Sequence, residues 1–337
     1  MARPYGLLRC GFPYVKTLGM RRIINYPVDM ALGKEGRMYI LCKADNAALI
    51  RKYNYDDEDL GTIGAMGKEE GQFTWPASII TDGDENIYVC DEALNRISAF
   101  DIEGEFKGAW GESGDGEGRL NRPSGMALAG DGNILVSDTL NHRVQKFTKD
   151  GQFLMTFGSF GDGEGELNMP WGITVDDEGS IYVADWRNDR VQKFTADGEF
   201  VFALGRSGSG EGEFNRPTDV AVDGHGDIYV CDWGNDRVQM FNPEPRYVQK
   251  FLGDATLSKI AREYMLTNAS PNRMRDMANL EASKYLRRPK SVTVDDDGKL
   301  FITDNKSYRV QVYQKEVIEL TPEQFAAPMR SPTLNQE

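Results

Sequence analysis

The sequence predicts an all-β protein, a six-bladed β-propeller, from three observations. First, six units share one pattern: a proline, an apolar run, a turn, a second run that ends in Asp in most units, then Arg and a third run. Second, each unit holds four β-like segments. Third, the last unit lacks its fourth segment, and a matching segment stands near the N-terminus. Such repeats must be recognised before any local motif is interpreted.

The spacing of the repeated proline sets the size of one unit. The six positions are Pro27, Pro76, Pro123, Pro170, Pro217 and Pro289. They lie 49, 47, 47, 47 and 72 residues apart, so the last interval corresponds to one unit plus an insertion of 25 residues. One interrupted unit among regular ones indicates a repeat fold with a local addition.

The fourth unit illustrates the four expected strands. They cover Trp171–Asp176, Ser180–Asp185, Arg190–Phe194 and Phe200–Gly205, and they are rich in Val, Ile, Phe and Tyr. Gly and Asp in the turns between them tolerate the positive φ that tight hairpins require. A lone four-stranded sheet cannot bury both apolar faces, so neighbouring sheets must stack, and a closed ring achieves this.

Closure of the ring follows from the ends of the pattern. The sixth unit reaches only its third strand, Arg309–Tyr313, before the pattern stops. Tyr14 to Gly19 is similar to Phe153 to Gly158, the fourth strand of the third unit. We therefore expect the N-terminal strand to complete the sixth blade and the propeller to span residues 14–315.

One unit, Asn121 to Phe147, reads NRPSGMALAGDGNILVSDTLNHRVQKF and resembles the repeats of NHL-repeat propellers. The resemblance extends over about residues 14–315 and is weakest in the first unit. There, Asp45 to Arg51 carries one residue more than Asp138 to Arg143. The family includes ubiquitin ligases, RNA binders, a peptide-amidating lyase and many bacterial proteins. It therefore implies the fold and leaves the function open. Without a RING-like or B-box cysteine cluster, the chain resembles the bacterial type.

Residue types that recur in most blades are attributed to the fold. An Asp at the end of the second strand is followed five residues later by an Arg, and charge-assisted hydrogen bonds between them are expected to fix the loop. The pairs are Asp91/Arg96, Asp138/Arg143, Asp185/Arg190, Asp232/Arg237 and Asp304/Arg309.

Residues that occur in single blades are candidates for function. Because strands alternate in direction, the loop before strand one and the loop between strands two and three share one rim. Tryptophans and arginines stand there in blades four to six and favour binding of a protein or small ligand, with packing between loops as the alternative. They are Trp171, Trp186, Arg187, Trp233, Arg216 and Arg288.

Asp29 and Asp219 are also singular, two residues after the repeated proline where other blades have Ser or Gly. Similarity to gluconolactonase and strictosidine synthase propellers implies a Ca²⁺ or Mg²⁺ site there and a metal-dependent hydrolase or lyase. A water-filled channel lining is the alternative. Zinc chemistry is not expected, because His142 and His225 are the chain's two histidines and both lie in repeat or turn positions.

Residues 254–288 interrupt the pattern between blades five and six. Leu257, Ile260, Ala261, Tyr264 and Met265 fall on one helical face, and Ser270 with Pro271 indicates the start of a second helix. A basic helical hairpin is therefore expected, as a lid, as a docking surface or as a cover for the propeller flank. Residues 316–337 form a tail without the repeat.

Charge and composition exclude some classes of partner. The net charge of -14 opposes general binding to nucleic acids or anionic membranes, and no apolar run is long enough to span a bilayer. Four dispersed cysteines favour free thiols in a cytoplasmic protein. The leading interpretation is a non-catalytic recognition scaffold. A metal-assisted hydrolase or lyase comes second and RNA binding third.

Overall fold

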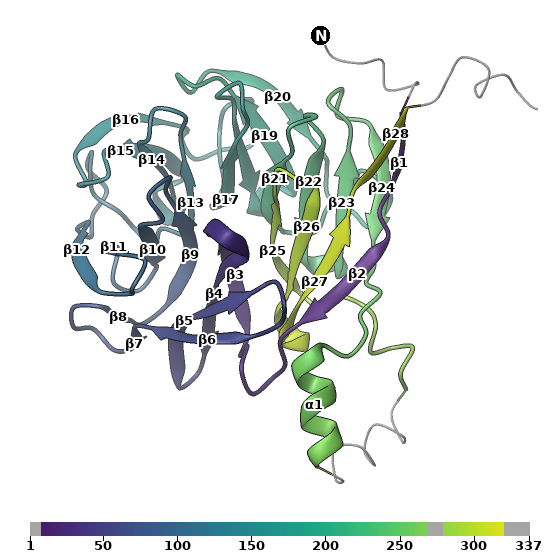
Figure 1. Ribbon diagram of the computed structural model, residues 1–337. Coiled ribbons are helices and arrows are strands. Elements are labelled where there is room, and N and C mark those ends of the chain that lie inside the picture. Colours follow the sequence, from purple (N-terminus) through teal and green to yellow (C-terminus); the bar gives the residue numbers. More distant parts are fainter. Residues whose placement is uncertain (1–7, 269–278, 320–337) are drawn as a thin grey trace, which may run out of the picture.

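The computed structural model describes residues 8–268 and 279–319 of the 337-residue chain. Six four-stranded antiparallel sheets stand side by side as the blades of a propeller (Figure 1). The fold is all-β with one α-helix in the described part, α1 (Lys259–Thr267). Among the described helices, none has the length and apolar content needed to cross a membrane. The predicted six-bladed propeller is confirmed.

Each blade runs from its innermost to its outermost strand in chain order, except blade six. Blade one comprises β3 (Pro27–Leu32), β4 (Arg37–Ala44), β5 (Ala47–Asn54) and β6 (Asp59–Ile63). Blade two comprises β9 (Pro76–Thr81), β10 (Ile87–Asp91), β11 (Arg96–Phe100) and β12 (Phe106–Trp110). Blade three comprises β13 (Gly125–Leu128), β14 (Ile134–Asp138), β15 (Arg143–Phe147) and β16 (Phe153–Phe157). Blade four comprises β17 (Pro170–Val175), β18 (Ile181–Asp185), β19 (Arg190–Phe194) and β20 (Phe200–Leu204). Blade five comprises β21 (Pro217–Val222), β22 (Ile228–Asp232), β23 (Arg237–Phe241) and β24 (Tyr247–Phe251). Blade six comprises β25 (Pro289–Val294), β26 (Lys299–Asp304), β27 (Arg309–Gln314) and β2 (Tyr14–Leu18).

Short elements connect these strands. One-turn 3₁₀ helices follow the second strands of blades three to six: η3 (Thr139–Asn141), η4 (Trp186–Asn188), η5 (Trp233–Asn235) and η6 (Asn305–Ser307). Another, η2 (Lys34–Gly36), lies between the first two strands of blade one. Two further pairs of strands lie outside the blades: β1 (Leu8–Gly11) with β28 (Glu316–Glu319), and β7 (Ala65–Met66) with β8 (Gln72–Phe73).

The ring closes as the sequence predicted. β2 pairs antiparallel with β27, with Tyr14 opposite Tyr313 and Leu18 opposite Val310. Apolar clusters fill the spaces between neighbouring blades, and one cluster joins Leu18 and Val310 of blade six to Met30 of blade one. The junction at the chain ends is therefore packed like the other blade interfaces.

Two segments differ from the expected pattern. The expected tail begins with a strand, because β28 pairs with β1 directly beyond the sixth blade. Of the expected helical hairpin, α1 is observed, and its start is fixed by the Ser258 hydroxyl, which accepts a hydrogen bond from the Ala261 amide at 3.1 Å. A second helix beginning at Ser270 would lie outside the described residues.

The strand register of blade one shows that the alignment of Asp45 with the repeated aspartate was wrong. Pro27 lies opposite Cys42, whereas Pro170, for example, lies opposite Asp185. Cys42 therefore takes the place of the repeated aspartate, and Asp45 belongs to the tight hairpin after it. The β4–β5 hairpin is two residues longer than its equivalents, because Cys42 pairs with Leu49, seven residues on, whereas Asp185 pairs with Arg190. Lys43 therefore lies in β4, opposite Ala48, where the other blades begin their loop.

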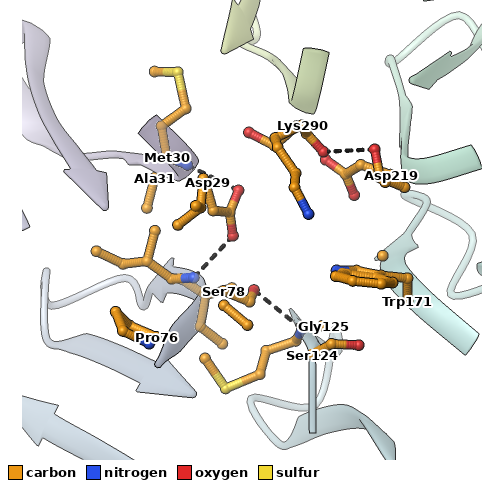
Figure 2. Close-up of a pocket in the computed structure, with 18 of the residues that line it drawn as sticks. Asp29, Met30, Ala31, Pro76, Ser78, Ser124, Gly125, Trp171, Asp219 and Lys290 are labelled. Atoms are coloured by element: carbon orange, nitrogen blue, oxygen red, sulfur yellow. Dashed lines mark hydrogen bonds between the residues drawn. The ribbon is translucent and has the colours of Figure 1, made fainter. Parts of the chain in front are cut away.

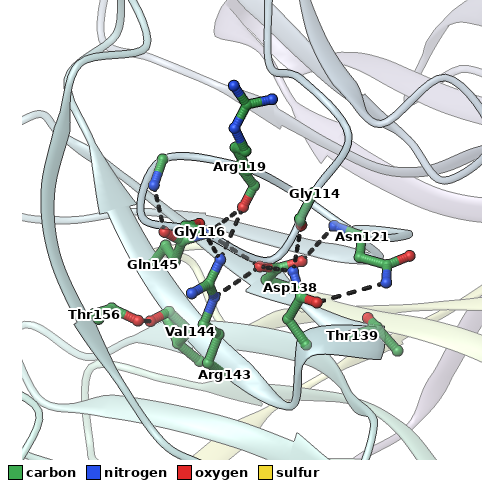
Figure 3. A network of polar contacts seen from close by, with 12 residues as sticks. Gly114, Gly116, Arg119, Asn121, Asp138, Thr139, Arg143, Val144, Gln145 and Thr156 are labelled. Atoms are coloured by element: carbon green, nitrogen blue, oxygen red, sulfur yellow. Dashed lines mark hydrogen bonds and ion pairs between the residues drawn. The ribbon is translucent and has the colours of Figure 1, made fainter.

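The repeated Asp and Arg form a buried network beside each loop (Figure 3). In blade three, the fully buried Asp138 accepts hydrogen bonds from the Asn121 amide at 2.6 Å and from Arg143 Nε at 2.9 Å. Gln145 Nε2 donates to the same carboxylate at 3.0 Å. Arg143 also donates to the carbonyl of Gly116 at 2.6 Å. One carboxylate thus ties together both loops of the rim.

Four of the five predicted pairs form this ion pair, at 2.7 to 2.9 Å. Blade two differs. Asp91 accepts bonds from the amides of Thr74 and Trp75, while Arg96 donates to the carbonyls of Glu69 and Gln72, and its Nε has no partner among the described residues. This blade also has Ser98 where other blades have the network glutamine.

Asp185→Ala should therefore lower the free energy of unfolding by about 3 kcal/mol or more, because it leaves the Arg190 guanidinium without its buried partner. Urea denaturation of both proteins measures the loss. Asp197→Ala, in an exposed turn of the same blade, is the control and should change stability by less than about 0.5 kcal/mol. Equal effects of the two changes would contradict a structural role for the network.

Candidate functional site

A central channel of about 1030 Å³ runs between the innermost strands of the six blades. Its wall comes from the residues that follow the repeated proline, and its mouth from the loops between strands two and three. Singular residues of several blades therefore meet at one opening, as the rim argument predicted.

Asp29 and Asp219 both line the channel (Figure 2), and both also hold neighbouring blades together. Asp29 accepts hydrogen bonds from the Met30 amide through Oδ1 and from the Ile79 amide of blade two through Oδ2, both at 2.8 Å. Asp219 accepts from the Val292 amide of blade six at 2.9 Å. These carboxylates thus serve as links between first strands.

Burial raises the pKa of Asp29 to about 6. Burial, and then the negative charge of Asp29, hold the pKa of Asp219 well above its usual range. Among the described residues, no three His, Cys, Asp or Glu side chains gather in a way that could hold a metal ion. Ca²⁺ takes six to eight oxygens, and both oxygens of Asp29 already accept backbone N–H groups. These residues do not fit the predicted Ca²⁺ or Mg²⁺ site.

Two lysines at the mouth are the most unusual charges of the site. The Lys290 side chain points into the channel (Figure 2), and its ammonium lies 4.3 Å from the ring centroid of Trp171. The Lys43 ammonium lies 2.9 Å from the ring centroid of Trp75. Both lysines are half-buried. No ion pair or hydrogen bond joins either ammonium to another residue in the described part of the chain.

The carboxylate whose charge acts most strongly on both lysines is Glu92, which is buried and 7% exposed to solvent. Arg122 pairs with it at 3.1 Å. Desolvation lowers the pKa of Lys43 to about 8 and also lowers the pKa of Lys290, while burial raises the pKa of Glu92. Three cations, Lys290, Arg122 and Lys43, therefore act on this one carboxylate at the mouth. The channel lining as a whole also includes the acidic side chains Asp29, Asp45 and Asp219.

The predicted rim residues divide into two groups. Trp171 faces the channel and contacts Trp186, with ring centroids 5.3 Å apart. The other aromatic rings pair with arginines across blade junctions: Arg216 lies 4.9 Å from the ring of Trp186, and Arg288 lies 4.1 Å from that of Trp233. Arg187 is exposed, 5.1 Å from the ring of Trp186. The structure thus brings Trp171 to the channel, joins blades through the pairs Arg216–Trp186 and Arg288–Trp233, and leaves Arg187 on the surface of its own blade.

His142 occupies a repeated structural position. Its Nδ1 accepts a hydrogen bond from the Met169 amide of the next blade at 3.1 Å. Asp189 and Asp236 accept bonds from the amides of Arg216 and Arg288 in the same way. The imidazole therefore replaces a carboxylate that bridges two blades.

The insertion lies on the flank of the propeller. The Ile260 amide donates to Asp57 Oδ2 at 2.8 Å, and Lys259 pairs with Glu58 at 3.4 Å, so α1 docks on a turn of blade one. The five residues of its expected apolar face are half-buried. None of its described residues, 254–268 and 279–288, lines the channel. These contacts agree with the interpretation that the insertion covers the flank of the propeller.

Sequence reasoning missed Lys43, Trp75, Glu92 and Lys290 as site residues. Lys290 could have been found by comparing the residues that occupy the same position in each blade. The residue after the proline is Val28, Ala77, Ser124, Trp171, Thr218 or Lys290, so a single lysine stands among small or apolar residues and one tryptophan.

Comparisons with known proteins agree with this geometry. The family model of the NHL repeat matches residues 120–147, 167–194, 214–241 and 286–313. No curated protein sequence gives a significant match to the chain.

Several solved structures share the fold at low identity. A catalytically inactive virginiamycin B lyase from Staphylococcus aureus with quinupristin is 12% identical, with a TM-score of 0.57, over 91% of this chain and 99% of that one. A gluconolactonase from Xanthomonas campestris is 15% identical, with a TM-score of 0.59, over 92% and 90%. A Bacteroides thetaiotaomicron protein of unknown function is 16% identical, with a TM-score of 0.60, over 92% and 76%. Four matched repeats within six closed blades show that this chain is a six-bladed β-propeller that contains NHL repeats.

Proposed function

We propose that this protein is a non-catalytic recognition module that binds a small organic anion in the mouth of its central channel. The observation that carries the proposal is the pair Lys43 and Lys290. Each holds a half-buried ammonium over an indole ring, and neither has an ion-pair partner among the described residues. A ligand carboxylate or phosphate supplies the charge that these groups lack.

The physical argument rests on desolvation. A partly buried ammonium loses hydration, which lowers the pKa of both lysines. Each contact with an indole stabilises the charged amine by about 0.5–2 kcal/mol. A charge-assisted hydrogen bond to an anion stabilises it more, by about 1.5–3 kcal/mol. Anion binding is therefore the interaction that best offsets the desolvation of these two ammonium groups.

The channel also suits an apolar body attached to the anion. Its volume of about 1030 Å³ is at the upper end of the range typical of small-molecule sites. Trp75, 45% exposed, and Trp171 offer ring faces and edges on which a flat group can rest. The ligand class that fits both features is a carboxylate with an aromatic or aliphatic body.

A metal-assisted hydrolase or lyase is less well supported. The solved structures with a similar fold include a lyase and a gluconolactonase, but identities of 12% and 15% concern the fold alone. Asp29 and Asp219 act as links between blades, and the described residues offer no third ligand beside them.

Phenylacetate serves as the probe for the proposed site. It should bind, detected by quenching of tryptophan fluorescence, and the neutral isostere phenylacetamide should bind at least about tenfold more weakly, because it cannot pair with the lysines. Lys290→Met should weaken phenylacetate binding by a similar factor. Lys107→Met, on the outer strand of blade two, is the control and should have no effect. Equal binding of acid and amide would contradict the proposal.

The affinity for phenylacetate should also depend on pH. An anion binds the charged form of Lys43, and the pKa of that amine is about 8, so affinity is full well below pH 8, is reduced by about half at pH 8 and falls further as pH rises to 10. Titration calorimetry at pH 7, 8, 9 and 10 measures the decline. Lys43→Arg keeps its charge over this range and should remove most of the decline. A profile that stays flat in the unchanged protein would refute the role of Lys43.

A further inference from the structure

A second cavity adjoins the channel mouth. Its volume is about 460 Å³, and its wall includes Arg21, Arg22 and Asn25. Tyr26, Ala44 and Asp45 line both this cavity and the channel, so the two spaces share one wall and open on the same side. Lys43, the cation at the channel mouth, directly precedes this shared wall.

Two guanidinium groups of the second cavity lack a partner of opposite charge. No ion pair or hydrogen bond connects Arg21 or Arg22 to another side chain within residues 8–268 and 279–319. Each instead rests on an aromatic ring: Arg21 lies 5.0 Å from the ring centroid of Tyr308, and Arg22 lies 4.8 Å from that of Tyr264. Ring stacking holds the guanidinium groups in place and leaves their N–H donors free.

The insertion contributes to this arrangement. Tyr264 belongs to α1, which is fixed to the flank by its contacts with Asp57 and Glu58. Tyr308 belongs to the loop of blade six and contacts Tyr26, with ring centroids 4.7 Å apart. Blade six and the insertion therefore contact the two arginines that line the second cavity, although neither Tyr264 nor Tyr308 is itself part of its wall.

Resting on the proposed function, we infer that the ligand is an elongated dianion, a small molecule with an anionic group at each end. One end pairs with Lys43 and Lys290 in the channel mouth. The other end pairs with Arg21 and Arg22, and the body crosses the shared wall at Tyr26. Guanidinium groups with free, coplanar donors are suited to a carboxylate or phosphate.

Asp45 opposes this ligand and so provides a test of its position. It is an exposed carboxylate on the shared wall. A dianion that crosses the wall passes close to this negative charge, which lowers the affinity. Removal of the charge by Asp45→Asn should raise the affinity for a dianion more than for a monoanion confined to the channel.

The experiment compares dicarboxylates with monocarboxylates of equal length by titration calorimetry. The probes are succinate, adipate and suberate against butyrate, hexanoate and octanoate. At one chain length or more, the dicarboxylate should bind about tenfold more tightly than its monocarboxylate, the gain of one charge-assisted contact. Arg21→Gln, Arg22→Gln and Tyr264→Leu should each reduce this ratio, and Asp45→Asn should increase it. Arg206→Gln, on an exposed loop after blade four, should leave the ratio unchanged.

The outcomes separate the two proposals. If monocarboxylates bind but no dicarboxylate binds more tightly, the dianion inference is wrong and the anion site stands. If the dicarboxylate advantage persists in both the Arg21 and Arg22 variants, the second cavity is not the site of the second anionic group. If no carboxylate binds at all, both proposals fail.

Discussion

The pairing of β2 with β27 is the contact on which this structure depends. It joins the first blade strand of the chain to the last, and it lets blades one and six pack against each other as the other neighbours do. Lys43, Trp75, Trp171 and Lys290 come from four different blades. They face one opening only because the ring is closed. The candidate site is thus a product of closure rather than of any local motif.

The repeats explain why function concentrates at so few positions. Within each regular blade, the Asp and Arg network satisfies the buried polar groups of the rim, and links such as His142 to Met169 hold neighbouring blades. The side chains in these roles already have hydrogen-bond or ion-pair partners within the protein. Lys43 and Lys290 stand at strand positions outside the network, and their ammonium groups are left to meet a ligand. An acidic protein with a net charge of -14 thereby places two lysines without an ion-pair partner among the described residues at its channel mouth.

Much of the fold was predictable because the repeat makes it visible. The proline spacing gave the number of blades, and the similarity of Tyr14 to Gly19 with another fourth strand gave the closure. β1 and β28 escaped prediction because they follow no repeat. The alignment of Asp45 was wrong because blade one has neither the repeated Asp nor the repeated Arg, and its hairpin is two residues longer. Only the register of Pro27 with Cys42 and of Cys42 with Leu49 resolves it.

The site was predictable in part. The shared rim and the channel position of Trp171, Asp29 and Asp219 were expected from strand direction. The pairing of Trp186 and Trp233 with arginines was not, because a contact between blades depends on their relative rotation. Trp75 was missed because blade two places its aromatic residue before the proline rather than in the loop.

The most direct measurement of the central claim is the titration of Lys43 itself. Nuclear magnetic resonance of its side-chain carbon and nitrogen atoms reports the pKa of this one amine, without and with phenylacetate. The account predicts a pKa of about 8 in the free protein and a higher value with the anion bound. A pKa near the ordinary value of about 10.4 that does not move with ligand would contradict it.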